Sequence, residues 1–496
     1  MNLASAIDAH PAGGPALVSQ GETTTYGELR SQVAAIRGAL VARGVAPGDR
    51  VAIVAANNPS FVTAYLGVLG AGGVAVPLNP LSPPPELGRE LAIVGARLAL
   101  VDDTGGSAFG GEAATGPDGL DVVAIGDLLG GEPAAMVERA EDDLAVLLFT
   151  SGTAGLPRAA MLTHGNLRAN IDQIRATTAS GAVDPAAGPA TADDVALGVI
   201  PLFHIFGLNA VLGLALTVGA TVVLVERFDP PATLALLSEH GVTVVSGVPT
   251  MWRAWADLPS RDAGDANPMA SVRLGVSGAA ALDPDLRRAI AARYGVVLAE
   301  GYGLTEASPV VTSGVGHQAP NGSIGLPLPG LLVRLIDRVG EDALVGDPGE
   351  VWVKGPNVFA GYWDDPEATR AALTEDGWLR TGDLAVVDDD GFLWLVDRAK
   401  DLIIVSGFNV VPAEVEAVLV GHPGVAEAAV VSVPDPRSGE AVKAFVVPVA
   451  GADIDEAAIV DHATRHLARY KCPSIITFVD ELPKGLTGKL LRRQLR

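Results

Sequence analysis

The feature that most constrains the fold is a repeated pattern of an apolar helical stripe, a glycine and then a short apolar run. Residues 29–40 carry apolar side chains on one helical face, Gly44 follows, and residues 51–55 are all apolar. The same order returns in residues 234–246 and again in residues 285–299. Helices that alternate with apolar strands indicate parallel sheets that are covered by helices on both faces.

The alternation stops near residue 331, where short strands follow one another without intervening helices. Asp390-Gly391 separates two of these strands, and an Asp-Gly pair between strands is typical of a hairpin. This part of the chain is therefore predicted to be antiparallel. The glycine- and alanine-rich stretches 103–119 and 180–194 predict surface loops.

The end of the chain has a small α+β pattern of its own. We expect helices near 413–419 and 456–467 and strands near 428–433 and 442–449. The fold class is therefore α/β, with a large N-terminal body of two parallel-rich α/β subdomains plus a β-rich subdomain, and a small mobile C-terminal α+β domain. We place the body at residues 1–398, a hinge at 399–401 and the C-terminal domain at 402–496.

Length, charge and cysteine content exclude several classes of protein. A chain of 496 residues is too long for one hydrophobic core, since single cores rarely exceed about 250–300 residues. The formal charge of −24, from 34 Lys+Arg and 58 Asp+Glu, argues against nucleic-acid partners and anionic membrane surfaces. The single Cys472 excludes an internal disulfide and a cysteine-built zinc site. The first residues show no secretory pattern, so we expect a cytoplasmic protein.

Residues 196–225 carry no formal charge and could be mistaken for a membrane span, which needs about 20 apolar residues. Pro201, His204 and Asn209 interrupt the stretch, and its period changes from strand-like to helical and back. The sequence therefore predicts a buried strand–helix–strand unit here and no integral membrane segment.

The first segment that suggests chemistry is a polar, glycine-containing loop after the apolar run 147–149. Glycines let backbone amides converge on an anion, hydroxyls donate further hydrogen bonds, and a cation neutralises charge. A phosphate site and an ordinary polar turn both fit this composition, and the loop lacks the Walker A pattern. Its candidate residues are Thr150, Ser151, Gly152, Thr153, Gly155 and Arg158.

Two later segments favour the phosphate interpretation. The triplet Gly301-Tyr302-Gly303 presents an aromatic ring that can stack on a base, and Thr305 and Glu306 follow it. The hydroxyl can reach a phosphate and the carboxylate suits Mg²⁺, although an ordinary turn has the same composition. Lys489 lies in a glycine-containing turn before a basic tail, which would otherwise be a solvated terminus.

Five segments in chain order resemble the motifs of the adenylate-forming superfamily, which includes acyl-CoA synthetases, firefly-type luciferases and peptide-synthetase adenylation domains. They are residues 150–157, 302–306, 381–383, 397–401 and 488–489. The resemblance covers essentially the whole chain and is closest to the fatty acyl-CoA synthetases. It implies that a carboxylic acid attacks the α-phosphate of Mg·ATP to give acyl-AMP and pyrophosphate. A thiol, that of coenzyme A, then captures the acyl group.

The resemblance also implies nucleotide-binding roles. The loop of residues 150–155 would hold the β- and γ-phosphates, Thr305 would contact the α-phosphate, and Glu306 would hold Mg²⁺. Arg158 replaces a common lysine and Ala154 a common threonine, so we expect weaker ATP binding without loss of activity. The nucleoside residues would be Tyr302 on one face of adenine, Gly278 and Ala279 on the other, Gly301 and Gly303 beside it, and Asp383 and Arg398 at the ribose.

Three further roles concern catalysis and domain movement. Lys489 would bridge the attacking carboxylate and the α-phosphate, where a preorganised cation stabilises crowded negative charge. Lys400 lies at the family's hinge, about which the small domain would swing between the two steps. Ser406 and Gly407 would then approach the pantetheine arm of coenzyme A.

Two apolar segments indicate the acid substrate. Peptide-synthetase domains usually carry an aspartate for the substrate ammonium, where this chain has Phe203, His204 and Phe206. We therefore expect a medium- to long-chain fatty acid, with His204 beside its carboxylate or packed in the core. Trp252 resembles an aromatic gate but would serve equally as core packing. The other acyl-site candidates are Phe206, Gly247, Val248 and Gly303, and Arg227 either meets a dicarboxylate or pairs with Glu226.

Other functions stay open. The chain could load a carrier protein in place of coenzyme A, use a malonyl-type dicarboxylate or an aryl acid, or act as a non-catalytic binding module. A compact chain without an obvious insertion favours coenzyme A, and the presence of Glu306, Asp383 and Lys489 favours an enzyme. Whether the protein forms a homodimer is also left open.

Overall fold

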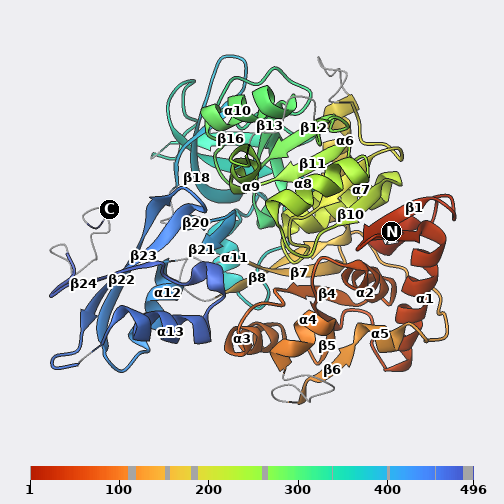
Figure 1. Cartoon of the computed structure of the whole chain (residues 1–496), viewed down its shortest axis with the longest axis horizontal. Helices are drawn as coiled ribbons and strands as arrows, with labels where there is room; N and C mark the ends of the chain where they lie inside the picture. The colour runs from red at the N-terminus through yellow and green to blue at the C-terminus, as the bar shows by residue number, and fades with distance from the viewer. Residues whose placement is uncertain are drawn as a thin grey trace.

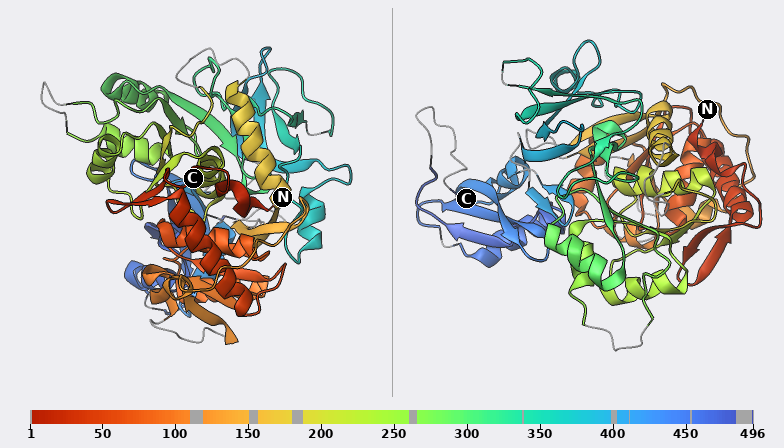
Figure 2. Two further views of the ribbon diagram at one scale, coloured as in Figure 1. Left: turned by 90° about the vertical axis from the view of Figure 1, so that its right-hand side faces the viewer. Right: turned by 90° about the horizontal axis from the view of Figure 1, so that it is seen from above.

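The computed structural model describes residues 2–109, 119–150, 157–179, 188–259, 266–337, 339–398, 403–410, 412–452, 454–483 and 495. These residues form four β-sheets, three in an N-terminal body and one in a smaller C-terminal domain (Figure 1). Both views of Figure 2 show the C-terminal domain, in blue, packed against one side of the body. The predicted α/β class with a separate C-terminal domain is confirmed. Residues 399–401 lie outside the described ranges, so the hinge and the domain boundaries stay predictions.

The first parallel-rich unit is a sheet of six described strands. In spatial order they are β6 (Asp121–Ala124), β5 (Leu98–Val101), β3 (Arg50–Val54), β4 (Val74–Leu78), β7 (Leu144–Thr150) and β8 (Arg158–Thr163). Every neighbouring pair is parallel except β7 with β8. The helices of this unit are α2 (Pro59–Gly70), α3 (Pro84–Val94), α4 (Asp103–Gly106), η2 (Ser107–Phe109) and α5 (Ile125–Leu128).

The loop predicted at 103–119 is wrong for its first part, because α4 and η2 occupy residues 103–109. The physical reason is a helix cap. The Asp102 side chain accepts a hydrogen bond from the Gly105 amide at 2.8 Å and so starts a turn that composition alone disfavours.

The second parallel-rich unit is a sheet of nine described strands. In spatial order they are β15 (Leu326–Pro327), β14 (Val310–Ser313), β13 (Leu298–Gly303), β12 (Leu274–Ser277), β11 (Val244–Gly247), β9 (Val195–Gly198), β10 (Thr221–Leu224), β1 (Pro15–Ser19) and β2 (Glu22–Thr25). The strands from β13 to β1 are parallel, and both edges are antiparallel. The helices of this part of the chain are η1 (Leu3–Ile7), α1 (Tyr26–Ala42), α6 (His164–Ala179), α8 (Pro230–Glu239), α9 (Pro249–Ala256), α10 (Pro284–Tyr294) and η6 (Thr305–Ala307).

The uncharged stretch 196–225 folds as the predicted strand–helix–strand unit. Its strands are β9 and β10, which pair in parallel. The helix between them begins as a π-helix, η5 (Phe206–Gly213), and continues as α7 (Leu214–Val218). In the described part of the chain, no helix is both long and apolar enough to cross a membrane.

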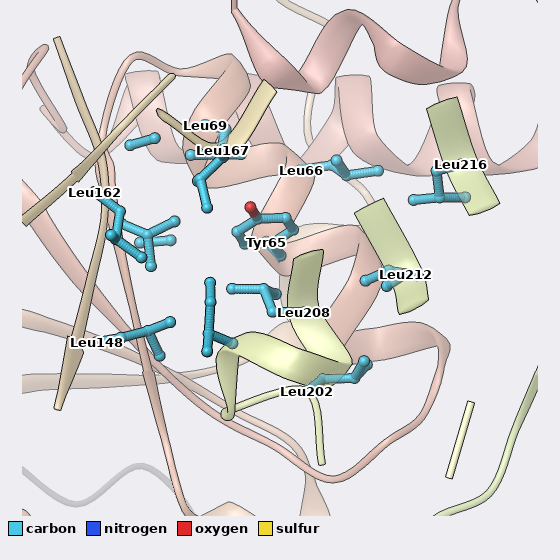
Figure 3. Close-up of a cluster of buried hydrophobic side chains, with 14 of the residues drawn as sticks. Tyr65, Leu66, Leu69, Leu148, Leu162, Leu167, Leu202, Leu208, Leu212 and Leu216 are labelled. Atoms are coloured by element: carbon cyan, nitrogen blue, oxygen red, sulfur yellow. The ribbon is translucent and has the colours of Figure 1, made fainter. Parts of the chain in front are cut away.

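One hydrophobic core joins the two units. Figure 3 shows Tyr65, Leu66 and Leu69 of α2 facing a leucine cluster that includes residues of η5 and α7. Leu208 and Leu212 of η5 belong to this buried cluster, with exposed fractions of 1% and 0%. Burial of this kind contributes roughly 1.5–3 kcal/mol per large side chain, so the two units are held as one body.

The remaining sheets are mainly antiparallel. The body's third sheet has the order β16 (Leu332–Ile336), β17 (Gly349–Lys354), β18 (Leu379–Val387) and β19 (Leu393–Arg398), with α11 (Pro366–Ala372) before β18. The predicted hairpin at Asp390-Gly391 is confirmed as the β18–β19 turn. The C-terminal domain contains β20 (Ile403–Val405), β21 (Phe408–Val410), α12 (Pro412–Val420), β22 (Val425–Asp435), β23 (Gly439–Pro448), α13 (Glu456–His466), η7 (Arg469–Lys471) and β24 (Ile475–Phe478).

Candidate nucleotide and acyl site

A cavity of about 1050 Å³ lies between the body and the C-terminal domain. Its body wall includes the ends of β7 and β13 and part of β18, and its other wall includes residues of β21 and η7. Ligands of open α/β sheets bind beyond the carboxyl ends of the strands, which is where this cavity lies on β7 and β13. It brings together the predicted residues Thr150, Arg158, His204, Ala279, Gly301, Tyr302, Gly303, Thr305, Glu306 and Asp383.

Some predicted residues lie outside the described part of the chain. They are Ser151, Gly152, Thr153, Gly155, Lys400 and Lys489. Arg398 is described only as a strand residue, which pairs with Asp383 across β18 and β19. The roles given to these residues stay predictions.

Arg158 is held beside the predicted phosphate loop by two contacts. It is the partner of Thr150 in the last pair of the β7–β8 ladder, so it lies at the mouth of the loop. Its Nε donates to Oδ2 of Asp365 at 2.9 Å, and its guanidinium lies 5.7 Å from the Tyr362 ring centre. The guanidinium is therefore oriented before any phosphate binds.

Glu306 follows β13 in η6 and is oriented by a tyrosine. The Tyr362 hydroxyl donates to Oε1 of Glu306 at 2.6 Å, and burial together with the Glu306 charge raises the pKa of Tyr362. Within the described ranges, no three His, Cys, Asp or Glu side chains group to hold a metal ion. One well-oriented carboxylate nonetheless fits Mg²⁺, which keeps waters and takes substrate phosphates as further ligands.

Tyr302 and Asp383 meet at the other end of the cavity. The Tyr302 hydroxyl donates to Oδ2 of Asp383 at 2.6 Å, and the Asp383 amide donates to Oγ1 of Thr381 at 3.1 Å. Ala279 follows β12 in the left-handed region, at φ +66°. The predicted adenine and ribose groups therefore share one wall, and the carboxylate is placed to accept hydrogen bonds.

A second, smaller cavity of about 190 Å³ has walls in common with the first at His204, Ala279, Tyr302 and Gly303. Its other lining residues are mostly apolar and come from α6, η5, α7, β11, β12, β14 and the loops beside them. They include Phe206, Ala210, Leu214, Leu274, Val276 and Gly278. A Cβ on Gly278 would lie 3.3 Å from the Phe206 ring, so glycine allows the ring to lie against the backbone. An apolar chamber beside a nucleotide site is suited to an acyl group.

His204 lies where the two cavities meet. Its Nδ1 accepts a hydrogen bond from the Phe206 amide at 3.2 Å, which leaves Nε2 to carry the proton of the neutral ring. Burial lowers the pKa of His204 to about 4. His204 is therefore a neutral hydrogen-bond donor at pH 7, and it lies on the walls of both cavities. Its contact with a substrate carboxylate stays a prediction.

Trp252 packs in the hydrophobic core, which is one of the two roles predicted for it. Its side chain is fully buried and makes an edge contact with Trp255 at 5.2 Å between ring centres. A Cβ on Gly247 would lie 3.0 Å from Nε1 of Trp252, so this glycine makes room for the indole. Trp252, Gly247 and Val248 do not line the two cavities, so the structure does not bring these three candidates into the acyl site.

The tip of the β20–β21 hairpin closes the small cavity from the C-terminal domain. Ser406 and Gly407 form the tip at φ +51° and +86°. A Cβ on Gly407 would lie 2.7 Å from Cγ1 of Val248 and 3.7 Å from Cβ of Ala279, both in the body. Val248 and Ala279 thus form the body surface that meets this tip, and the approach of the tip to the pantetheine arm of coenzyme A stays a prediction.

Several residues of the site have no local motif that could reveal them. Tyr362 and Asp365 orient Glu306 and Arg158 across 56 and 207 residues of sequence. Tyr470 stacks on Phe408 with ring centres 4.5 Å apart, and Phe408 stacks on Phe203 at 6.3 Å. Arg227, the proposed partner of a dicarboxylate, is exposed and lies outside the lining of both cavities.

Comparisons with known proteins cover the whole chain. A family model described as AMP-binding enzyme matches residues 3–363, and one described as AMP-binding enzyme C-terminal domain matches residues 414–489. A feruloyl-CoA synthase of Amycolatopsis sp. is 40% identical over 96% of this chain and 94% of its own length. A long-chain-fatty-acid–CoA ligase of Yersinia pestis is 36% identical over 97% of this chain and 91% of its own length.

A solved structure shows the same arrangement of domains. It is an o-succinylbenzoate CoA synthetase of Bacillus subtilis, a double mutant bound with a product analogue. The two structures superpose with a TM-score of 0.88 at 29% identity, over 100% of this chain and 98% of that chain. The similarity therefore includes the C-terminal domain as well as the body.

Proposed function

The chain belongs to the AMP-binding enzyme family and is an adenylate-forming acyl-CoA ligase, and we propose that its substrate is a compact, apolar carboxylic acid of phenylpropanoid size. The family's reaction uses ATP, Mg²⁺ and coenzyme A. The proposal replaces the medium- to long-chain fatty acid predicted from the sequence with the aryl acid that the sequence analysis left open. The feature that carries it is the small cavity beside His204.

The cavity's size limits the acyl group. Its volume of about 190 Å³ is below the roughly 300–1,000 Å³ typical of ligand pockets. Apolar side chains of α6, η5, α7, β11, β12 and β14 line it, and Phe206 is one of them. One ring with a short linker to the carboxylate suits such a chamber better than a flexible chain of sixteen carbons.

Charges on the cavity wall are already paired, which disfavours a dicarboxylate. Nε and Nη2 of Arg273 donate to the two carboxylate oxygens of Asp194 at 2.8 and 2.6 Å. Arg175 lies 3.5 Å from Asp172. A second substrate carboxylate would have to compete with these partners, and burying an unpaired carboxylate is costly.

The residues of this chain would divide the chemistry between the two ends of the site. Asp383 would bind the ribose, and Glu306, steadied by Tyr362, would bind Mg²⁺, which neutralises phosphate charge when bound. Arg158 would contribute positive charge near the phosphates. His204, with its proton on Nε2, would donate a hydrogen bond to the carboxylate of the acid and hold it at the border of the cavities.

A second candidate substrate is a medium-chain fatty acid, which the apolar lining favours. A ring and a short chain bury similar apolar surface, whereas only the ring gains from the edge and face of Phe206. The carrier-protein acceptor and the homodimer stay open possibilities. The cytoplasmic location stays a prediction from the sequence.

A competition experiment tests the substrate class. Equimolar ferulate, cinnamate, octanoate, palmitate and malonate are supplied together with ATP, Mg²⁺ and coenzyme A, and the thioesters are separated by mass. We expect the two aryl thioesters to dominate, followed by octanoyl-CoA. Dominance of palmitoyl-CoA or malonyl-CoA would refute the proposal.

A further inference from the structure

A buried charged cluster joins the body to the C-terminal domain; its residues lie outside the five sequence motifs but belong to the wall of the large cavity. Nζ of Lys471 donates to Oε1 of Glu86 at 2.6 Å and to Oε1 of Glu414 at 3.0 Å. The side chains of Glu86, Lys471 and Glu414 are only 3%, 9% and 8% exposed. The other oxygen of Glu86 accepts from the Ala468 amide at 2.7 Å. Both oxygens of one body carboxylate therefore bind the C-terminal domain.

The cluster depends on the orientation of the two domains. Lys471 and Glu414 belong to the C-terminal domain and would move together, whereas Glu86 belongs to α3 of the body. Any rotation of the C-terminal domain would separate Glu86 from Lys471 and from the Ala468 amide. Because these contacts can form only in the orientation seen here, the cluster is specific to that orientation.

Glu90, one helical turn after Glu86, does not add a full negative charge beside Lys471. Burial, followed by the charge of Glu86, raises the pKa of Glu90 to about 8, so its carboxyl is mostly protonated at pH 7. Lys471 then faces the carboxyl groups of Glu86 and Glu414, and Glu414 is on its own domain. The interdomain attraction is therefore the contact between Lys471 and Glu86.

A chain of ring contacts links the cluster to the acyl site. Tyr470 precedes Lys471 in η7, and its ring stacks on Phe408 at 4.5 Å between ring centres. Phe408 follows Gly407 at the hairpin tip and stacks on Phe203 of the body at 6.3 Å. The segment that Glu86 anchors is thus the segment that supports the hairpin tip.

We propose that Glu86 and Lys471 are positioning residues for the thioester-forming step, holding the Ser406–Gly407–Phe408 tip over the acyl cavity through their interdomain ion pair. Their charged atoms bind one another, Glu414 and the Ala468 amide rather than a motif residue. The inference rests on the proposed function, because it assumes two half-reactions that need different domain orientations. Formation of the acyl-adenylate should not need the pair, since the C-terminal domain must leave this orientation to bring Lys489 to the phosphates.

The test measures each half-reaction in the full-length Glu86→Gln variant. Glutamine keeps the size and the acceptor for the Ala468 amide but removes the charge that faces Lys471. We expect thioester formation from pre-made acyl-adenylate and coenzyme A to slow by about 10-fold, the loss typical of one charge-assisted hydrogen bond. Pyrophosphate release with ATP and the acid should be unchanged or faster.

Three further variants separate positioning from general destabilisation. Asp461→Asn removes the exposed ion pair with Arg465 in the same domain and should change neither half-reaction. Lys471→Arg keeps the charge and should retain most of the thioester rate, whereas Lys471→Met should lose it. Thermal unfolding of each variant shows whether the protein is folded at the assay temperature.

The outcomes distinguish this inference from the proposed function. If the unmodified enzyme makes no thioester with any acid, the proposed function fails. If it makes thioesters but Glu86→Gln slows both half-reactions equally, or slows neither, the ion pair has no positioning role and the inference is wrong.

Discussion

Replacing Gly407 by alanine should block thioester formation while leaving acyl-adenylate formation intact. Gly407 has φ +86°, and its added Cβ would lie 2.7 Å from Cγ1 of Val248. Carbon atoms normally approach to about 3.5–4.0 Å, so the hairpin tip must withdraw from the body. Strain from the left-handed backbone adds roughly 1–2 kcal/mol. Overpacking costs of about 1–3 kcal/mol then predict a loss of roughly 10- to 100-fold in the thioester step.

The chain offers a matched control for the backbone strain. Gly451, in the same domain, has φ +81°, but a Cβ there would meet no atom within 4 Å. Gly451→Ala should therefore lower stability slightly and leave the thioester step unchanged. Adding Val248→Ala to Gly407→Ala removes the atom that the new Cβ meets and should restore part of the rate.

The assay is single-turnover mixing of acyl-adenylate with coenzyme A, beside pyrophosphate release in the absence of coenzyme A. If Gly407→Ala slowed pyrophosphate release as much as thioester formation, the hairpin tip would serve both steps or only stability. If it changed neither, the close approach to Val248 would have no functional meaning.

Three other substitutions test individual residues. Tyr362→Phe removes the hydroxyl that orients Glu306, so half-maximal pyrophosphate release should need roughly 10-fold more Mg²⁺, as found for outer-shell partners of metal ligands; an unchanged Mg²⁺ titration would contradict this. Trp252→Ala should lower the free energy of unfolding by about 3–5 kcal/mol in a urea titration, with the order of preferred acids unchanged, because the indole packs in the core. His204 has a pKa of about 4 in the folded protein, below its usual 6.5, so its contribution to stability is complete above pH 6.5 and is lost as the pH falls toward 4. Thermal melts of His204→Gln should therefore depend less on pH across that window than those of the unmodified protein, and equal slopes would refute the burial of a neutral ring.

Much of the fold could be predicted because burial leaves a local pattern. Four of the five residues of β3 are buried, and such strands appear in the sequence as continuous apolar runs, here at residues 51–55. The β18–β19 hairpin has its Asp-Gly pair in the sequence itself. The helical turns at 103–109 could not be predicted in this way, since the cap that Asp102 provides outweighs the effect of two glycines.

The site residues also include some that could be predicted from the sequence and others that could not. Tyr302, Glu306 and Asp383 could be predicted because each lies in a short motif, and the fold then brings these motifs to one cavity. Trp252 could not be assigned, because its side chain could face either side of α9. The indole lies against Gly247 and Gly275, where the missing side chains make room for it.

The contacts between the domains could not be predicted, because no local sequence pattern indicates them. Glu86 and Lys471 are 385 residues apart, and Glu86 in a helix with polar neighbours reads as a solvated side chain. Only the packing of η7 against α3 shows that both charges are buried.

The most direct test of two steps carried out in two orientations is the pair of half-reactions in Lys489→Ala. In the orientation described here, the Gly407 tip covers the acyl cavity, so Lys489 is expected to act only when the C-terminal domain has turned. Pyrophosphate release should then fall by at least ~10²-fold, as for loss of a preorganised charge in a transition state. Thioester formation from pre-made acyl-adenylate and coenzyme A should keep most of its rate. An equal loss in both half-reactions would contradict the account.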